Sequence, residues 1–117
     1  MHASNEGINP DAEPSGTGCQ ECMRTGGWWF HLRRCAQCGH IGCCDSSPSQ
    51  HARHHFHDTG HPVIANFEPD DPWFFDFRSN AVFDGPRLRP PLHHPLDQPV
   101  PGPHGKVPRG WENLLND

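Results

Sequence analysis

Two C-x2-C pairs that lie close together constrain this chain more than any other feature of its sequence. The pairs are Cys19 with Cys22 and Cys35 with Cys38. Two thiolates at this spacing can bind one tetrahedral metal ion, and two such pairs in succession are typical of structural zinc sites. A redox role of the thioredoxin type is disfavoured, because no β-α-β pattern surrounds either pair. The spacing therefore predicts a fold that is held together by zinc.

The composition explains why the chain would need a metal. Its 117 residues suffice for one domain, but only 32% of them are hydrophobic, while 14 are proline and 12 are glycine. A core this small compensates poorly for the entropy lost when the backbone becomes ordered, and small domains usually add disulfides or a metal. The N-terminal residues lack the basic and apolar regions of a secretory signal. We therefore expect a reducing, cytoplasmic environment and zinc rather than disulfides.

Charge and hydropathy argue against several classes of partner. The sequence has no apolar run of the length that a transmembrane helix needs, so no membrane partner is expected. The formal net charge of −5 argues against nucleic acid. Arg33 and Arg34 form a short basic run, which we interpret as solvated surface. The chain is expected to be a monomer.

The segment 51–61 contains five histidines and follows residues that typically start a helix. Ser47 and Gln50 match a capping box, and Gly60 is placed to end the helix. The pattern predicts a helix that runs from about Pro48 to Asp58. The sequence thereby places most of the histidines on one regular element.

The period of that helix separates the histidines by direction. His51 and His55 lie on one face, whereas His54 and His57 point away from it and are expected to be solvated. His61 follows the end of the predicted helix, where the chain can turn back to the same region. The four paired cysteines and three of these histidines, His51, His55 and His61, give seven candidate ligands.

Two tetrahedral zinc ions require eight ligands, so one more is needed. The adjacent thiols of Cys43 and Cys44 are available. Neighbouring side chains in extended backbone point in opposite directions, so only one of the two is expected to face a metal. The spacing alone does not decide which one.

The rest of the chain predicts short strands between two coil regions. Aromatic and β-branched residues favour strands at 28–32, 61–68, 72–77 and 81–83. The composition divides the chain into a disordered lead at 1–18, a folded domain at 19–83 and a Pro-rich tail at 84–117. We expect residues 84–109 to be extended coil, because their prolines disfavour a packed element. Residues 110–117 could form a single amphipathic turn that docks back through Trp111, Leu114 and Leu115, or a short peptide that another protein binds.

The order of these motifs resembles the zinc finger of the ubiquitin-specific-protease (UBP) type, in particular its small stand-alone bacterial members. The shared pattern is C-x2-C, an aromatic strand, C-x2-C-G-H-x-G-C-C-D-S-S-P and H-A-x2-H-x5-H-P, from Cys19 to about Trp73. The resemblance implies two interleaved zinc sites, with Cys43 favoured over Cys44. The first implied site contains Cys19, Cys22, Cys43 and His51, and the second contains Cys35, Cys38, His55 and His61. We predict a small zinc-stabilised α+β domain, in which a short antiparallel sheet packs on one helix.

The same resemblance implies a non-enzymatic interaction module that binds a peptide or a protein chain end. Eukaryotic relatives bind the free Gly-Gly terminus of ubiquitin with an aromatic cleft and an arginine. Trp29, Trp73 and Phe74 are the residues of this chain that we expect to line such a groove. Asp45 occupies the position of the arginine and would repel a carboxylate, which argues against ubiquitin tails as the ligand.

Two other functions would use the same residues. A redox- or zinc-responsive regulator would depend on Cys44 beside Cys43, where oxidation could release a metal. A zinc hydrolase would need an open coordination position, and eight ligands close both sites. We therefore expect no enzymatic activity.

Overall fold

A five-stranded antiparallel sheet forms the centre of the computed structural model, which describes residues 7–70 and 72–115. The strands are β1 (Leu32–Cys35), β2 (Ile41–Cys43), β3 (Val63–Asn66), β4 (Phe74–Asp76) and β5 (Ala81–Phe83). The helices are α1 (Gln20–Thr25), α2 (His51–Thr59) and the 3-10 helix η2 (Trp111–Leu114). This architecture confirms the predicted α+β domain. No helix among the described residues is long and apolar enough to cross a bilayer.

The register of the sheet separates the cysteines into two groups. The strand order is β2-β1-β3-β4-β5, and Leu32 of β1 lies opposite Cys43 of β2. Cys35 lies at the other end of β1, opposite Ile64 of β3. The β1–β2 hairpin therefore carries one thiol at each end. Helix α2 packs along this hairpin, and Gly42 permits the close approach, since a Cβ there would lie 2.8 Å from the backbone nitrogen of Ala52.

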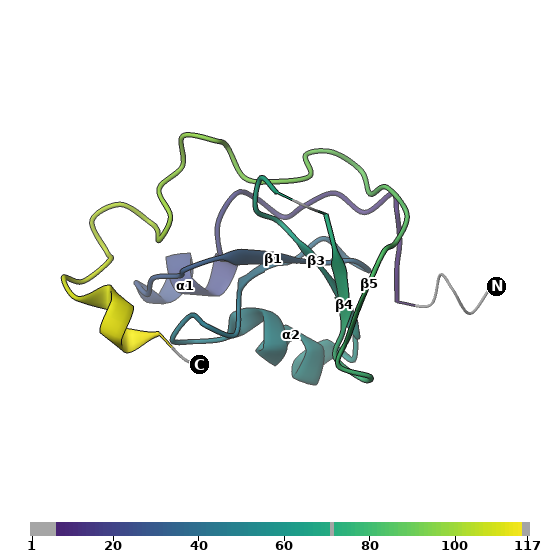
Figure 1. Ribbon diagram of the computed structural model, residues 1–117, viewed down its shortest axis with the longest axis horizontal. Coiled ribbons are helices and arrows are strands. Elements are labelled where there is room, and N and C mark those ends of the chain that lie inside the picture. Colours follow the sequence, from purple (N-terminus) through teal and green to yellow (C-terminus); the bar gives the residue numbers. More distant parts are fainter. Residues whose placement is uncertain (1–6, 71, 116–117) are drawn as a thin grey trace.

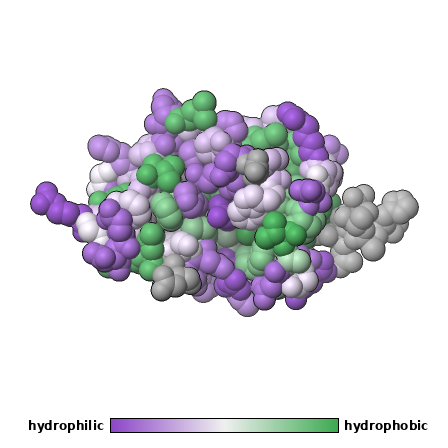
Figure 2. Space-filling model, in the orientation of Figure 1, coloured by the Kyte–Doolittle hydropathy of each residue, from purple (hydrophilic) through white to green (hydrophobic). Residues whose placement is uncertain are grey.

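The two faces of the sheet are covered differently (Figure 1). Helix α2 lies on one face, while the coil segments before α1 and after β5 cross the other. The coil-covered face buries a cluster made of Ile8, Ala36, Val63, Ala65, Phe74 and Leu88. A second cluster contains Cys19, Cys22, Trp29, Leu32, Ile41, Cys43 and Phe67. Figure 2 shows a largely hydrophilic surface on the viewed face, with hydrophobic residues in small separate patches.

Helix α2 ends as predicted but begins later than expected. Gly60 has a φ of 77° and its N–H bonds to the carbonyl of Phe56, so it ends the helix. The helix starts at His51 rather than Pro48, because Gln50 adopts a left-handed conformation with φ 49° and makes no capping bond. The Oγ of Ser47 instead accepts a hydrogen bond from the amide of Phe30 at 2.8 Å. Helix α1 and strand β2 were not predicted, since both are too short for a periodic pattern.

The segment 7–18 is packed against the domain, contrary to the expectation of a disordered lead; the rest of the expected lead, 1–6, lies outside the described residues. Ile8 is buried, and the amide of Asn9 donates to the carbonyl of Ala36 at 2.7 Å. The Oγ of Ser15 accepts from the amide of Ile41 at 2.9 Å. Hydrogen bonds of the backbone and of a hydroxyl group hold this segment in place. Such bonds require no periodic pattern of hydrophobic residues, so the sequence did not indicate the packing.

Residues 84–109 of the Pro-rich tail are coil as predicted, but they are also fixed to the domain. Arg34 is 2% exposed, so the expectation that it is solvated surface was wrong. Its guanidinium donates to the carbonyls of Ala12, Arg89 and Pro91 at 2.7–3.0 Å and ties both coil segments to β1. Trp111 of η2 returns to the domain, with its ring centroid 5.4 Å from that of Phe30.

Candidate metal centres and binding pocket

The first metal centre lies between α1, β2 and the start of α2. Cys19 is the N-cap of α1, Cys22 lies in its first turn, Cys43 ends β2 and His51 begins α2. The Nδ1 of His51 lies 3.2, 3.3 and 3.6 Å from the sulfurs of Cys19, Cys22 and Cys43. The three thiols are fully buried.

The second metal centre lies at the other end of the β1–β2 hairpin. Cys35 ends β1, and Cys38 lies in the turn that follows. His55 is one helical turn after the first site's histidine, and His61 follows the end of α2. The sulfur of Cys38 lies 3.4 Å from Nε2 of His55, and the sulfur of Cys35 lies 3.6 Å from Nδ1 of His61.

Both sets of ligand atoms fit a tetrahedral zinc ion. Within each set the ligand atoms lie within 4.8 Å of one another. Zinc bonds of about 2.3 Å to sulfur and about 2.0 Å to nitrogen imply sulfur–nitrogen separations near 3.5 Å and sulfur–sulfur separations near 3.8 Å. The observed sulfur–sulfur distance between Cys22 and Cys43 is 4.0 Å. The six cysteines are free thiols, and the two sets suit two zinc ions per chain.

Electrostatics favour a cation in the first set. Contacts with Cys22 and Cys43 hold the pKa of Cys19 well below its usual range. Contact with Cys19 raises the pKa of Cys22 to about 12, and contacts with both neighbours raise the pKa of Cys43. One thiolate is thus favoured and the others resist ionisation without a counter-charge. A divalent cation stabilises all three thiolates together.

The second set presents a neutral imidazole to the metal. Burial, together with His40 and His61, lowers the pKa of His55 to about 4. The ring of His40 stacks on that of His55, with centroids 4.2 Å apart and an interplanar angle of 2°. The Nε2 of His40 lies 2.8 Å from Oε2 of Glu21. These contacts of His40 and Glu21 fix the plane of the His55 ring.

The helical-face prediction for the remaining histidines is confirmed. His54 and His57 are exposed and belong to neither ligand set. His51 and His55 are half-buried and face the hairpin. Cys43 rather than Cys44 completes the first set. The sulfur of Cys44 instead lies 3.3 Å from the hydroxyl of Ser47.

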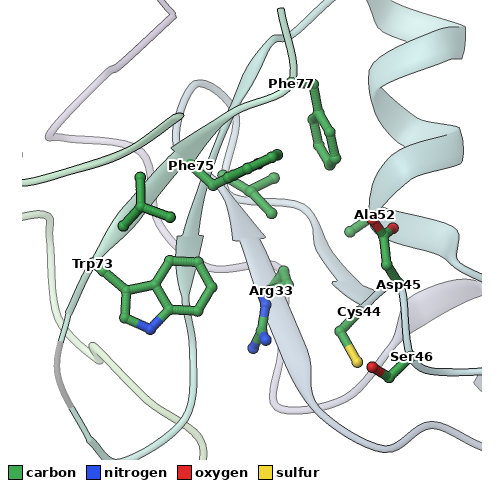
Figure 3. A pocket seen from close by; sticks show the side chains of 10 residues that line it. Arg33, Cys44, Asp45, Ser46, Ala52, Trp73, Phe75 and Phe77 are labelled. Atoms are coloured by element: carbon green, nitrogen blue, oxygen red, sulfur yellow. The ribbon is translucent and has the colours of Figure 1, made fainter. Parts of the chain in front are cut away.

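A pocket of about 200 Å³ lies between the sheet and the start of α2 (Figure 3). Trp73, Phe75 and Phe77 form its aromatic wall, and Arg33 lies at its centre in the view. Cys44, Asp45 and Ser46 lie across from the aromatic wall. The pocket therefore combines an aromatic wall with ionic groups.

Arg33 is a pocket residue whose position sequence reasoning missed. Its Cζ lies 4.7 Å from the ring centroid of Trp73, and its Nη1 donates to Leu32 O and Asn66 Oδ1, both at 3.0 Å. No residue in 7–70 or 72–115 accepts a hydrogen bond from its Nε or Nη2. Side chains alternate along a strand, so Arg33 and Arg34 face opposite sides of the sheet. This alternation along a strand was the sequence signal that could have separated Arg33 from Arg34.

Asp45 does not act as an isolated negative charge. The Nε of Arg53 lies 3.1 Å from both carboxylate oxygens of Asp45, and the guanidinium lies 4.8 Å from the ring centroid of Phe77. Arg53 comes from α2 and has no motif that links it to Asp45 in the sequence. Of the residues that line the pocket, Arg33 and Asp45 carry opposite charges, and the charge of Asp45 is paired with Arg53.

Of the three aromatic residues expected to line one groove, the structure brings Trp73 alone to this pocket. Trp29 is 3% exposed, packs in the core beside the first metal centre and pairs its backbone with Gly102. Phe74 is buried in the cluster on the coil-covered face. Because side chains alternate along β4, Phe75 rather than Phe74 shares the pocket face.

Comparisons with known proteins agree with this arrangement. A family model described as a zinc finger in ubiquitin hydrolases and other proteins matches residues 19–88. The solution NMR structure of a protein from Rhodopseudomonas palustris aligns with a TM-score of 0.65 and 39% identity, covering 86% of this chain and 95% of that one. No curated protein matches the chain. The family match extends beyond Phe83, our expected boundary, into the coil that buries Leu88.

Proposed function

The chain belongs to the family of zinc fingers in ubiquitin hydrolases and other proteins, and we propose that it is a non-enzymatic module that binds the C-terminal end of a peptide or protein. The observation that carries this proposal is the guanidinium of Arg33, held over Trp73 inside the pocket. We place the protein in the cytoplasm, where its thiols remain reduced.

The chemistry of Arg33 supports a carboxylate as the recognised group. A guanidinium binds a carboxylate through two parallel N–H bonds, and its remaining donors face the pocket rather than a described acceptor. Asn66 and Trp73 fix the orientation of the group before a ligand arrives. Preorganisation of this kind reduces the entropy lost on binding. The proposal thus assigns to Arg33 the role that Asp45 cannot perform.

The size and wall of the pocket support small terminal residues. A volume of about 200 Å³ is small for a ligand site, and Trp73, Phe75 and Phe77 restrict it on one side. A terminus of glycine or alanine brings its carboxylate to Arg33 without a side chain that must be accommodated. We therefore propose chain ends with small last residues as the ligand class.

The closed metal sites support a structural rather than a catalytic role for zinc. Each set supplies four side-chain ligands, which leaves no coordination position for water or substrate. Zinc in such a site cross-links the segments that ligate it. The position of Cys44 also favours binding over redox regulation, because its sulfur faces the pocket and Ser47 rather than the first metal set.

A ¹H–¹⁵N NMR titration of the zinc-loaded chain tests the proposal. The probes are short peptides ending in Gly-Gly, as the free acid and as the C-terminal amide. We expect the free acid to shift the signals of Arg33, Trp73 and Phe75, and the amide to have little effect. Equal shifts with both peptides, or no shift with either, would contradict chain-end recognition.

A further inference from the structure

The Pro-rich tail contributes one buried histidine to the domain. His94 is 1% exposed, although it lies in coil. Its Nε2 lies 2.8 Å from Oε1 of Glu68, and its Nδ1 lies 2.8 Å from the carbonyl oxygen of Pro95. A carbonyl oxygen only accepts hydrogen bonds, and an ionised carboxylate also only accepts. Both ring nitrogens must therefore carry hydrogen, which makes the ring an imidazolium cation.

Glu68 is the matching anion. Burial alone would raise its pKa, but the nearby His31 and the hydrogen bonds from His94 and the amide of Leu32 outweigh burial and lower the pKa to about 2. Its Oε2 accepts from the amide of Leu32 at 2.8 Å, and Nδ1 of His31 lies 3.4 Å from its Oε1. Removing one partner of a buried charge pair with this number of hydrogen bonds strongly destabilises the folded protein.

This charge pair is linked to the binding pocket by the loop between β3 and β4. The amide of His94 donates to the carbonyl of Phe67 at 3.0 Å, at the start of the loop. The amide of Glu68 donates to Oδ1 of Asn66 at 3.2 Å, and the same oxygen accepts from Nη1 of Arg33 at 3.0 Å. The loop then leads to Trp73, whose carbonyl accepts from the amide of Asn66 at 3.0 Å.

We propose that His94 is a positioning residue for the pocket: as a buried cation from the tail, it fixes Glu68 and its loop and thereby orients Arg33 and Trp73. The tail is then part of the binding module rather than an appended linker. The effect on ligand affinity rests on the proposed function. The charge state of His94 and the order of the loop do not, and they are measurable without a ligand.

The test uses the full zinc-loaded chain with His94→Gln, and His104→Gln as the matched control. His104 is an exposed histidine of the same Pro-rich tail. In the unsubstituted chain at pH 7, ring ¹⁵N spectra should show both nitrogens of His94 protonated. In His94→Gln, amide exchange at Leu32 should accelerate by about a hundredfold, while both zinc ions stay bound. The preference for free-acid over amide peptides should fall by about tenfold, and His104→Gln should change none of these quantities.

Each outcome bears on the inference separately from the proposed function. An unprotonated ring nitrogen on His94 at pH 7 would overturn it, and this measurement needs no variant. Unchanged exchange at Leu32 in His94→Gln would overturn it as well. Faster exchange with an unchanged acid-to-amide preference would refute the positioning role. If the unsubstituted chain binds neither peptide, the proposed function fails, while the ring and exchange measurements still decide whether His94 orders the loop.

Discussion

Replacing His55 by alanine tests whether the histidine helix serves to deliver metal ligands. His55 lies at the second metal centre, 3.4 Å from the sulfur of Cys38, whereas its neighbour His54 is exposed. Both substitutions remove the same imidazole from the same helix and change its intrinsic propensity equally. The pair therefore controls for helix propensity and for the removal of an imidazole as such.

The expected magnitude follows from the ligand count. Structural zinc sites contribute about 10–16 kcal/mol in zinc-finger peptides, so one of four ligands accounts for about 3 kcal/mol on average. That corresponds to roughly a hundredfold loss of zinc affinity at the second site. It is also a large fraction of the stability of about 5–15 kcal/mol that is typical of a domain. The stacked contact of His55 with His40 is lost in addition.

Chelator competition and native mass spectrometry measure the effect directly. We expect His55→Ala to release one zinc ion at a chelator concentration that leaves both bound to the unsubstituted chain. Its thermal midpoint should fall by about 10 °C or more. His54→Ala should retain two zinc ions and the original midpoint. Equal loss of zinc in both variants would refute the assignment of the helix faces.

Three further predictions test other parts of the structure. Gly39→Ala should destabilise the domain far more than Gly60→Ala. A Cβ at Gly39 would lie 1.8 Å from a backbone oxygen of the N-terminal segment, whereas Gly60 has open space and only the left-handed strain of about 1–2 kcal/mol. Urea midpoints of the two variants measure the difference, and an equal loss of stability would contradict the packing of that segment. By mass spectrometry, Cys43→Ser should lose one zinc ion, whereas Cys44→Ser should retain both, also after treatment with mild peroxide. Metal release that depends on Cys44 would instead support the redox-regulator function. Since the folded-state pKa of Glu68 lies near 2, below its usual value of 4.5, its own contribution to stability is complete above pH 4.5 and is lost only as the pH falls toward 2. The difference in urea midpoint between the unsubstituted chain and Glu68→Gln should therefore not decrease as the pH is lowered from 7.5 to 6 with excess zinc, and a decrease would contradict an ionised Glu68 in the folded state.

The metal centres were predictable because their signal is local and discrete. Thiols in C-x2-C pairs and histidines one helical turn apart have few alternative structural explanations. The choice between Cys43 and Cys44 came from family resemblance, and β2 explains it physically, since alternate residues of a strand face opposite sides. The start of α2 was misplaced because Ser47 bonds to a residue far away in the sequence instead of capping the helix.

The coil segments and the pocket were harder to predict because long-range pairs define them. Nothing in the local sequence links Arg53 to Asp45, or His94 to Glu68. The expected lead and tail are poor in apolar residues. The hydrogen bonds that Arg34 donates to carbonyls of both segments help to hold them in place. Arg33 and Arg34 form a single basic run in the sequence. Because they are neighbours on a strand, Arg33 lies in the pocket and Arg34 lies beneath the coil segments.

The most direct test of the central claim is a calorimetric comparison of Gly-Gly peptides as free acid and amide, on the zinc-loaded chain and on Arg33→Gln. Arg24→Gln, which changes an exposed arginine at the end of α1, is the control. We predict that the chain and the control prefer the free acid and that Arg33→Gln loses this preference while it keeps two zinc ions. A preference that survives in Arg33→Gln would contradict the account of the pocket as a carboxylate receptor.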